Sequence, residues 1–383
     1  MNMGTLGKQL VFALIRLVNR IVKRRKGIVL CSGWQGKRFA DNSRYLFLYL
    51  NEHRDRLGLK KIIWITRSPE IKRALREAGY TAYALYSAPS LYYHLKAGSF
   101  FYDQFFSDFL RPLAGDAIRV NLWHGMPIKK FGCLIEGIDW KLQKGYLLTC
   151  SPLGDETIGR AFAISPAQAL HGMYPRNHYL LHPMPFLMPA EQRLLSRINE
   201  EKRKNKRILF YLPTFRKTDP VFLGEKDPAR LQAFFHFLES RNYFLLTKLH
   251  FKDLTDHAAA PGHPQAEVLL NLPPQTDIYP FLKETDVLIT DYSSVLFDFL
   301  YLQKEIIGYV YDLDYYQQQD QGLVIDYDTL PLDKATDLDE LETLLAAKTT
   351  TTDRHAAARH AWLERSFGKY TLPDTLRPFF PHA

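Results

Sequence analysis

The sequence has 383 residues, of which 46% are hydrophobic and 24% charged, so it describes a globular protein long enough for two domains. Its 50 lysines and arginines outnumber its 41 acids, and the net charge of +9 favours anionic partners such as nucleic acid, anionic lipid or phosphorylated substrates. The three cysteines have no paired or metal-ligand spacing, which argues against a disulfide scaffold and against a structural zinc site.

Residues 6–26 predict a basic amphipathic helix. The segment contains seven lysines and arginines and no acid, and its aliphatic side chains share one half of the helical wheel. Arg16 and Arg20 interrupt the apolar run, which is unlike a secretory signal, and no segment of the chain is apolar enough to span a bilayer. Two interpretations remain open: residues 1–26 lie on an anionic membrane surface, or they form a first helix packed on the core.

Two series of alternating strands and helices follow residue 27. The first series predicts strands at 28–31, 61–66, 99–102 and 119–123 and helices at 42–51 and 69–78. The second begins after a charged, apolar-poor stretch at 193–207 and predicts strands at 208–212, 243–249, 287–290 and 306–309, with helices at 228–240, 278–283 and 294–302. We therefore expect two doubly wound α/β domains, 27–190 and 191–383, that face each other across a cleft, with site residues directly after strands.

The first candidate site follows the strand at 119–123. There the chain reads His124-Gly125-Met126-Pro127-Ile128-Lys129-Lys130. Gly125 and Pro127 bracket a tight turn, which would hold the His124 imidazole at the strand end with two lysines close behind. The arrangement suits a general base beside a phosphate, although a single histidine such as His124 or His250 is more often structural than catalytic.

Polar residues also follow three strands of the second series. They are Pro213-Thr214-Phe215-Arg216, His250, and the run Asp291-Tyr292-Ser293-Ser294-Val295-Leu296-Phe297-Asp298. Ser293 or Ser294 is a candidate N-cap, and the helix N-terminus behind it offers free N–H groups to a phosphate. The last run could be a helix cap and nothing more, but polar clusters at strand ends in both halves are what a cleft enzyme requires.

These motifs resemble those of the CDP-glycerol glycerophosphotransferases, the teichoic-acid primases and polymerases. The resemblance is carried, in the family's order, by Gly33-Trp34-Gln35-Gly36-Lys37-Arg38-Phe39-Ala40-Asp41-Asn42-Ser43-Arg44-Tyr45-Leu46, Asn121-Leu122-Trp123-His124-Gly125-Met126-Pro127-Ile128-Lys129, Tyr174-Pro175-Arg176-Asn177, Leu212-Pro213-Thr214-Phe215-Arg216, Lys248-Leu249-His250 and Ile289-Thr290-Asp291-Tyr292-Ser293-Ser294-Val295-Leu296-Phe297-Asp298. It covers residues 28–310.

The resemblance implies a GT-B type pair of Rossmann-like domains that transfers glycerol phosphate from CDP-glycerol to a hydroxyl and releases CMP. By position, the family's two active-site histidines correspond to His124 and His250, and its phosphate-binding arginine corresponds to Arg176. The donor side and the other expected substrate contacts are Ser293, Ser294, Asp298, Gly125, Met126, Pro127, Ile128, Pro213, Thr214, Lys248 and Leu249. Met126 stands where threonine is usual, and Lys248 stands where arginine is common.

The resemblance also implies the partners and the location. The acceptor would be a prenyl-diphosphate-linked saccharide at the cytoplasmic face of the cell membrane, where the protein would be peripheral, and the product a teichoic acid or a related cell-surface or capsular polymer. No Asp-x-Asp pair or carboxylate cluster follows a strand of the first half, so the sequence requires no metal and no cofactor.

Two alternative functions remain open, and two others are argued against by the sequence. One is transfer of ribitol phosphate from CDP-ribitol, and another is a GT-B glycosyltransferase that uses a nucleotide sugar. A nucleic-acid-binding protein would show an aromatic-lined basic stripe, which is absent from the sequence, so no nucleic-acid partner is expected. A noncatalytic membrane scaffold would have no use for two histidines at strand ends.

Overall fold

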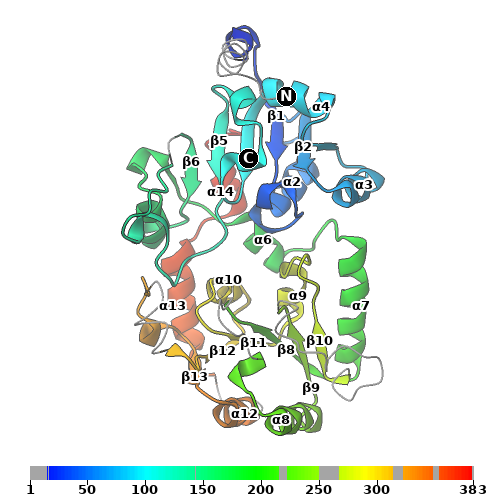
Figure 1. Ribbon diagram of the computed structural model, residues 1–383, viewed down its shortest axis with the longest axis vertical. Helices are drawn as coiled ribbons and strands as arrows, with labels where there is room; N and C mark the ends of the chain where they lie inside the picture. The colour runs from blue at the N-terminus through cyan, green and yellow to red at the C-terminus, as the bar shows by residue number, and fades with distance from the viewer. Residues whose placement is uncertain are drawn as a thin grey trace, which may run out of the picture.

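The computed structural model describes residues 15, 17–142, 144–214, 222–249, 267–313, 322–347 and 353–381, which form two α/β halves stacked along the long axis (Figure 1). Each half is built on a parallel β-sheet with helical connections. This arrangement confirms the predicted doubly wound α/β class.

The first sheet forms the centre of the upper half in Figure 1. Its strands lie in the order β3 (Ala82–Ala84), β2 (Lys61–Thr66), β1 (Arg25–Cys31), β4 (Ala97–Tyr102), β5 (Ile118–Asn121), β6 (Tyr146–Leu148) and β7 (Ala169–Leu170). Its helices are α2 (Asp41–Glu52), α3 (Pro69–Glu77), α4 (Ala88–Lys96), α5 (Pro152–Gly154) and α6 (Pro175–Leu181), with short turns at η1 (Trp34–Gly36) and η5 (Asp155–Gly159).

The second sheet forms the lower half. Its strands lie in the order β10 (Leu269–Asn271), β9 (Tyr243–Thr247), β8 (Arg207–Leu212), β11 (Val287–Thr290), β12 (Glu305–Tyr309) and β13 (Asp333–Ala335). Its helices are α7 (Pro189–Arg203), α8 (Pro228–Ser240), α9 (Tyr279–Glu284), α10 (Val295–Phe299) and α12 (Leu338–Ala347), with short turns at η9 (Leu300–Leu302) and η10 (Tyr327–Thr329). The central strands β9 and β11 are buried along their whole length, because helices cover both faces of the sheet.

Strand order reverses once in each sheet, and these reversals fix where a ligand can bind. In the first sheet the chain starts at β1, runs outward to β3 and then returns to β4 on the other side of β1. The second sheet repeats this pattern with β8 and β11. Loops diverge at such a switch point, so each half has a crevice at the carboxyl ends of these strand pairs.

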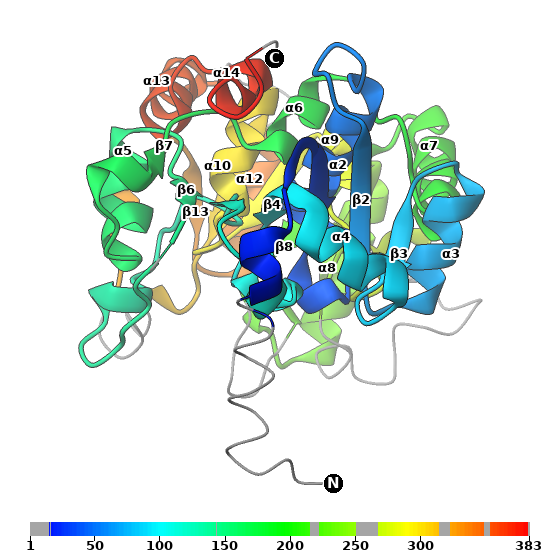
Figure 2. The ribbon, with the colours of Figure 1, turned by 90° about the horizontal axis from the view of Figure 1, so that it is seen from above.

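The C-terminal helices return from the second half to the first. Helix α13 (Ala356–Phe367) contacts α5, and α14 (Leu372–Leu376) places Thr375 against Met173, whose main-chain N–H donates to Thr375 Oγ1 at 2.8 Å. Figures 1 and 2 show both helices, in red, reaching the α5–β7 side of the first half. The C-terminal helices therefore also pack on the core of the first half.

The start of the chain differs from the predicted helix. Among the described residues the helix ends at Ile21, whereas Arg25 and Lys26, which we expected to be helical, begin β1. The side chain of Arg24 donates hydrogen bonds to Asp116, to Asn19 and to three main-chain carbonyl oxygens. No helix in the described part of the chain is long and apolar enough to cross a membrane.

Candidate active site

An aspartate bridges the two loops at each switch point. After β4, Asp103 accepts a hydrogen bond of 2.7 Å from the main-chain N–H of Ser43, which belongs to the loop and helix that follow β1. After β11, Asp291 accepts from the main-chain N–H of Thr214, which follows β8, at 2.8 and 3.0 Å. Each carboxylate thus ties together the two loops that diverge at its switch point.

His124 lies at the end of β5 in a constrained turn. The preceding Trp123 has a φ of +53°, a conformation that is unfavourable for a bulky side chain and is typical of functional sites. The Trp123 and His124 rings are in contact, with centroids 3.8 Å apart, and the centroid of the Trp34 ring lies 5.9 Å from that of His124. Two indole rings therefore lie next to the imidazole.

The surroundings of His124 keep its ring neutral. Burial lowers the pKa of His124 below its usual 6.5, and the Asp41 carboxylate offsets part of that shift. Nδ1 lies 3.3 Å from the main-chain oxygen of Asp103. Because a carbonyl oxygen only accepts, Nδ1 carries the proton in this tautomer and Nε2 has the free lone pair that a general base needs.

Gly125 brings the first half into contact with the second. A Cβ atom on Gly125 would lie 2.6 Å from Oγ of Ser294 and 3.0 Å from Nη2 of Arg176, so only glycine fits there. Ser294 occupies the N-cap position of α10, as predicted, but its hydroxyl makes no capping hydrogen bond to the helix. The hydroxyl faces the turn of the first half instead.

A group of four buried side chains, which we call the central charge cluster, joins the halves at this point. It consists of Asp41, Arg176, Tyr279 and Asp298. Nη1 of Arg176 lies 2.6 Å from Asp41 Oδ1, and its Nη2 lies 2.6 Å from Asp298 Oδ2. The Tyr279 hydroxyl donates to the same oxygen of Asp298 at 2.8 Å. Burial opposes the charge on Arg176, but the carboxylates of Asp298 and Asp41 raise its pKa well above the usual range.

A second buried ion pair lies next to this cluster. Arg44 on α2 donates to both carboxylate oxygens of Glu191 on α7, at 2.6 and 2.7 Å, and lies 3.6 Å from Asp277 of the second half. Asp277 in turn accepts from the main-chain N–H of Asp41 at 3.1 Å. The two halves are thus joined by paired charges that are removed from water.

The remaining predicted residues fall into three groups. Thr214 lies at the second switch point, and half-buried Lys248 follows β9, where burial lowers its pKa. Met126 and Ile128 are 0% and 1% exposed and Leu249 is also buried, so their side chains form core rather than cleft. Pro127 and Pro213 are half-buried. His250 lies outside the described residues.

The sequence reasoning missed the acidic members of the site. Asp41, Asp103, Asp277 and Glu191 were assigned no role, although each is buried. A signal existed for Asp41 alone, the polar run Asp41-Asn42-Ser43-Arg44 at the start of a helix that is buried up to Leu50. Among the residues that the structure describes, no three His, Cys, Asp or Glu side chains are grouped to hold a metal.

The sequence matches the family described as CDP-glycerol:poly(glycerophosphate) glycerophosphotransferase over residues 12–371. The teichoic acid glycerol-phosphate transferase of Staphylococcus aureus is 24% identical over 340 residues, which cover 83% of this chain and 82% of that protein. The teichoic acid ribitol-phosphate primase of Bacillus spizizenii is 26% identical over 262 residues, 63% of this chain and 64% of that protein.

Solved structures of the wall teichoic acid polymerase TagF have the same fold. One aligns with a TM-score of 0.72 at 18% identity and covers 98% of this chain and 95% of that chain. A TagF variant soaked with CDPG aligns with the same score over 97% and 92% of the two chains. Since the family match extends over most of its length, the chain belongs to the CDP-glycerol:poly(glycerophosphate) glycerophosphotransferase family.

Proposed function

We propose that this enzyme transfers glycerol phosphate from CDP-glycerol to a hydroxyl of a membrane lipid-linked saccharide and releases CMP, in the synthesis of teichoic acid or a related cell-surface polymer. The observation that carries the proposal is the meeting of the His124–Gly125 turn with Ser294 across the two halves. Family membership supports the donor, and so does the soak of a TagF variant with CDPG.

In the proposed reaction His124 acts as the general base. Its Nε2 takes the proton of the acceptor hydroxyl, and the alcohol oxygen then attacks the phosphorus that bears glycerol. The bond from that phosphorus to the bridging oxygen breaks, and CMP leaves with the electron pair. A pKa below 6.5 keeps the base in its neutral form at neutral pH.

We assign neutralisation of the donor's phosphates to the second half. Ser293, Ser294, Thr214 and Lys248 follow its strands, and a positioned cation with hydrogen-bond donors stabilises the charge that develops in phosphoryl transfer. Arg176 enters the proposal mainly as a positioning residue, because both of its Nη atoms already bind carboxylates. The Nε–H and the second N–H of each Nη atom are not used by these two carboxylates.

The test measures CMP release from CDP-glycerol with a synthetic prenyl-diphosphate disaccharide as acceptor. His124→Ala should lower turnover by about 10²-fold or more, the usual contribution of a positioned acid–base group. His360→Ala is the matched control, because this exposed histidine lies on α13, outside the proposed site, and should leave turnover unchanged. Near-normal turnover of the His124 variant would remove this residue from the mechanism.

Mass analysis of the product of the same reaction distinguishes the alternative donors. We expect product mass to increase by one glycerol phosphate with CDP-glycerol, and we expect no product with CDP-ribitol or a nucleotide sugar. A product from CDP-ribitol alone would overturn the choice of polyol, which the relative named as a ribitol-phosphate primase makes a specific alternative. A product from a nucleotide sugar alone would make the enzyme a glycosyltransferase.

We also propose that the protein binds peripherally at the cytoplasmic membrane face through its N-terminal helix. Leu17 and Ile21 are 52% and 70% exposed, and Arg20 and Lys23 beside them are exposed as well. Such a surface can bury apolar side chains among acyl chains and place cations at anionic headgroups. Replacing both Leu17 and Ile21 by Asp should reduce sedimentation with anionic vesicles, and equal sedimentation would contradict the proposal.

A further inference from the structure

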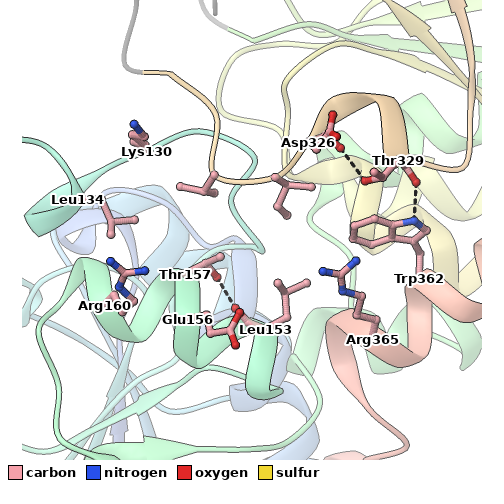
Figure 3. Close-up of a pocket in the computed structure, with 12 residues that line it drawn as sticks. Lys130, Leu134, Leu153, Glu156, Thr157, Arg160, Asp326, Thr329, Trp362 and Arg365 are labelled. Carbon is pink, nitrogen blue, oxygen red and sulfur yellow. Dashed lines mark hydrogen bonds between the residues drawn. The ribbon is translucent and has the colours of Figure 1, made fainter.

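A cavity of about 530 Å³ lies between the two halves beside the candidate active site (Figure 3). From the first half it is lined by Arg160, which follows η5, and by Lys130, the last residue of the segment His124–Lys130, which we call the His124 motif. From the second half it is lined by Asp326 before η10 and by Trp362 and Arg365 of α13. No residue that we assign to CDP-glycerol is among its lining residues.

The cavity has three cations that lack a carboxylate partner within the described residues. Lys130, Arg160 and Arg365 are all exposed, and none makes an ion pair with a described acid. Figure 3 shows Arg160 and Arg365 on opposite sides of the cavity, on different halves of the molecule. Two guanidinium groups that face one space from opposite walls are suited to phosphate oxygens, which they bind through charge-assisted hydrogen bonds.

Other lining groups favour a phosphate that carries a polyol or sugar over a bare phosphate ion. The exposed Glu156 carboxylate, the Asp326 carboxylate and the Thr157 hydroxyl can accept hydrogen bonds from ligand hydroxyls. Trp362 is held in place because its Nε1 donates to the main-chain oxygen of Thr329 at 2.7 Å. The Arg365 guanidinium stacks on the Trp362 ring at 4.6 Å, which fixes its position as well.

The cavity wall is continuous with the His124 motif. The main-chain N–H of Lys130 donates to Gly322 at 3.0 Å, and the N–H of Val324 donates to Ile128 at 2.8 Å, so the motif is paired with the loop that forms the opposite wall. The Thr157 hydroxyl, which lines the cavity, donates to the main-chain oxygen of Leu153 at 2.8 Å and lies 3.6 Å from the sulfur of Met126. A ligand in the cavity therefore touches the segment that carries His124.

We propose that this cavity binds a phosphate-bearing polyol or saccharide group of the acceptor, an inference that rests on the proposed function. The donor's phosphates have the same chemistry, so the experiment must separate the two substrates. Steady-state kinetics do so, because the Michaelis constants of CDP-glycerol and of a short-chain prenyl-diphosphate disaccharide are measured independently.

Arg365→Ala and Arg160→Ala should each raise the acceptor KM by roughly tenfold, the effect of losing one charge-assisted hydrogen bond, and leave the CDP-glycerol KM unchanged. Arg365→Lys should recover part of the loss. The control is Lys369→Ala, because Lys369 is also exposed but lies outside the cavity and pairs with Glu364. An unchanged acceptor KM, or a rise in the donor KM instead, would overturn the inference.

A binding measurement separates this inference from the proposed function. Titration of a synthetic glycerol phosphate trimer into the CMP-bound enzyme should show saturable binding that Arg365→Ala weakens and Lys369→Ala does not. Equal binding by the wild type and the Arg365 variant would contradict the cavity assignment even if turnover is normal. Absence of CMP release from the wild type, with trimer binding intact, would contradict the proposed function and leave the cavity assignment supported.

Discussion

The central charge cluster and the inter-half cavity use cations in opposite ways. In the cluster, Arg176 is buried and bound by two carboxylates. Around the cavity, Arg160 and Arg365 are exposed and make no ion pair with a described acid. A charge taken out of water costs several kcal/mol unless it is paired, whereas an exposed charge can exchange its hydration for a ligand. The comparison teaches that the partners of an arginine, more than its place near a motif, indicate whether it is free to bind phosphate.

The largest expected effect comes from removing the paired cation. Arg176→Ala leaves Asp41 and Asp298 buried without their counter-charge, so the free energy of unfolding should fall by about 3 to 5 kcal/mol. Arg365→Ala removes an exposed charge and should change it by less than about 0.5 kcal/mol. Urea denaturation followed by circular dichroism measures both values. A similar decrease in the free energy of unfolding in the two variants would contradict the difference between paired and unpaired cations.

Protonation of His124, which lies beside the cluster, provides a second test. Because burial lowers its pKa below 6.5, the ring stays neutral as pH falls to 6.5 and becomes protonated only at lower pH. A base is active when neutral, so kcat/KM should fall by less than about twofold between pH 7.5 and 6.5 and then about tenfold per unit well below the pKa. An acid limb with a midpoint above pH 7 would contradict this assignment.

The comparison extends to the N-terminal segment, where neighbouring cations differ in the same way. Arg24 donates to Asp116 and to several main-chain carbonyl oxygens, so Arg24→Ala should lower the free energy of unfolding by about 1 to 3 kcal/mol. Lys23 is exposed, and Lys23→Ala should leave that free energy within about 0.5 kcal/mol. Sedimentation with anionic vesicles should weaken in the Lys23 variant. A loss of stability in Lys23→Ala as large as in Arg24→Ala would contradict the difference between the two cations.

The smallest expected effect compares two serines at helix starts. Ser68 caps α3 by accepting from the N–H of Ile71 at 3.3 Å, so Ser68→Ala should cost about 1 kcal/mol of stability without changing either KM. Ser294 makes no such bond, so Ser294→Ala should leave stability unchanged and raise the CDP-glycerol KM. Thermal unfolding measures the stability of both variants, and steady-state kinetics measure the CDP-glycerol KM. If Ser294→Ala raised the acceptor KM alone, the donor would have to bind to the first half.

The elements that the sequence predicts well are the ones whose environment is local and uniform. The buried strands β2 and β11 begin and end where the apolar runs at 61–66 and 287–290 do. Helix α7 was mistaken for a charged connection, because only a few of its residues, including Ile198, are buried. Short edge strands such as β7 are not predictable, because two residues are too few to show an alternation of apolar and polar side chains.

The candidate site was predictable in part, because its residues follow strands that the sequence reveals. The motifs at strand ends predicted that the His124 turn and Ser294 would lie at the facing edges of the two sheets, and the structure brings Gly125 and Ser294 close together there. The pairing of Arg176 with Asp41 and Asp298 could not be predicted, although Asp298 itself was an expected site residue, because the two carboxylates lie 135 and 122 residues from Arg176 in the sequence. The spacing of these residues in the sequence does not indicate that they are in contact. The family resemblance implied only that Arg176 binds phosphate.

The return of α13 and α14 to the first half has a consequence for synthesis on the ribosome. Met173 makes its hydrogen bonds with Thr375, 202 residues later in the chain, and the Phe101 ring packs on Phe379. At about 5 to 20 residues per second, translation needs about 10 to 40 s to cover that distance. During this interval part of the first core stays uncovered, so the nascent chain has to be protected from aggregation until α14 and Phe379 have been translated.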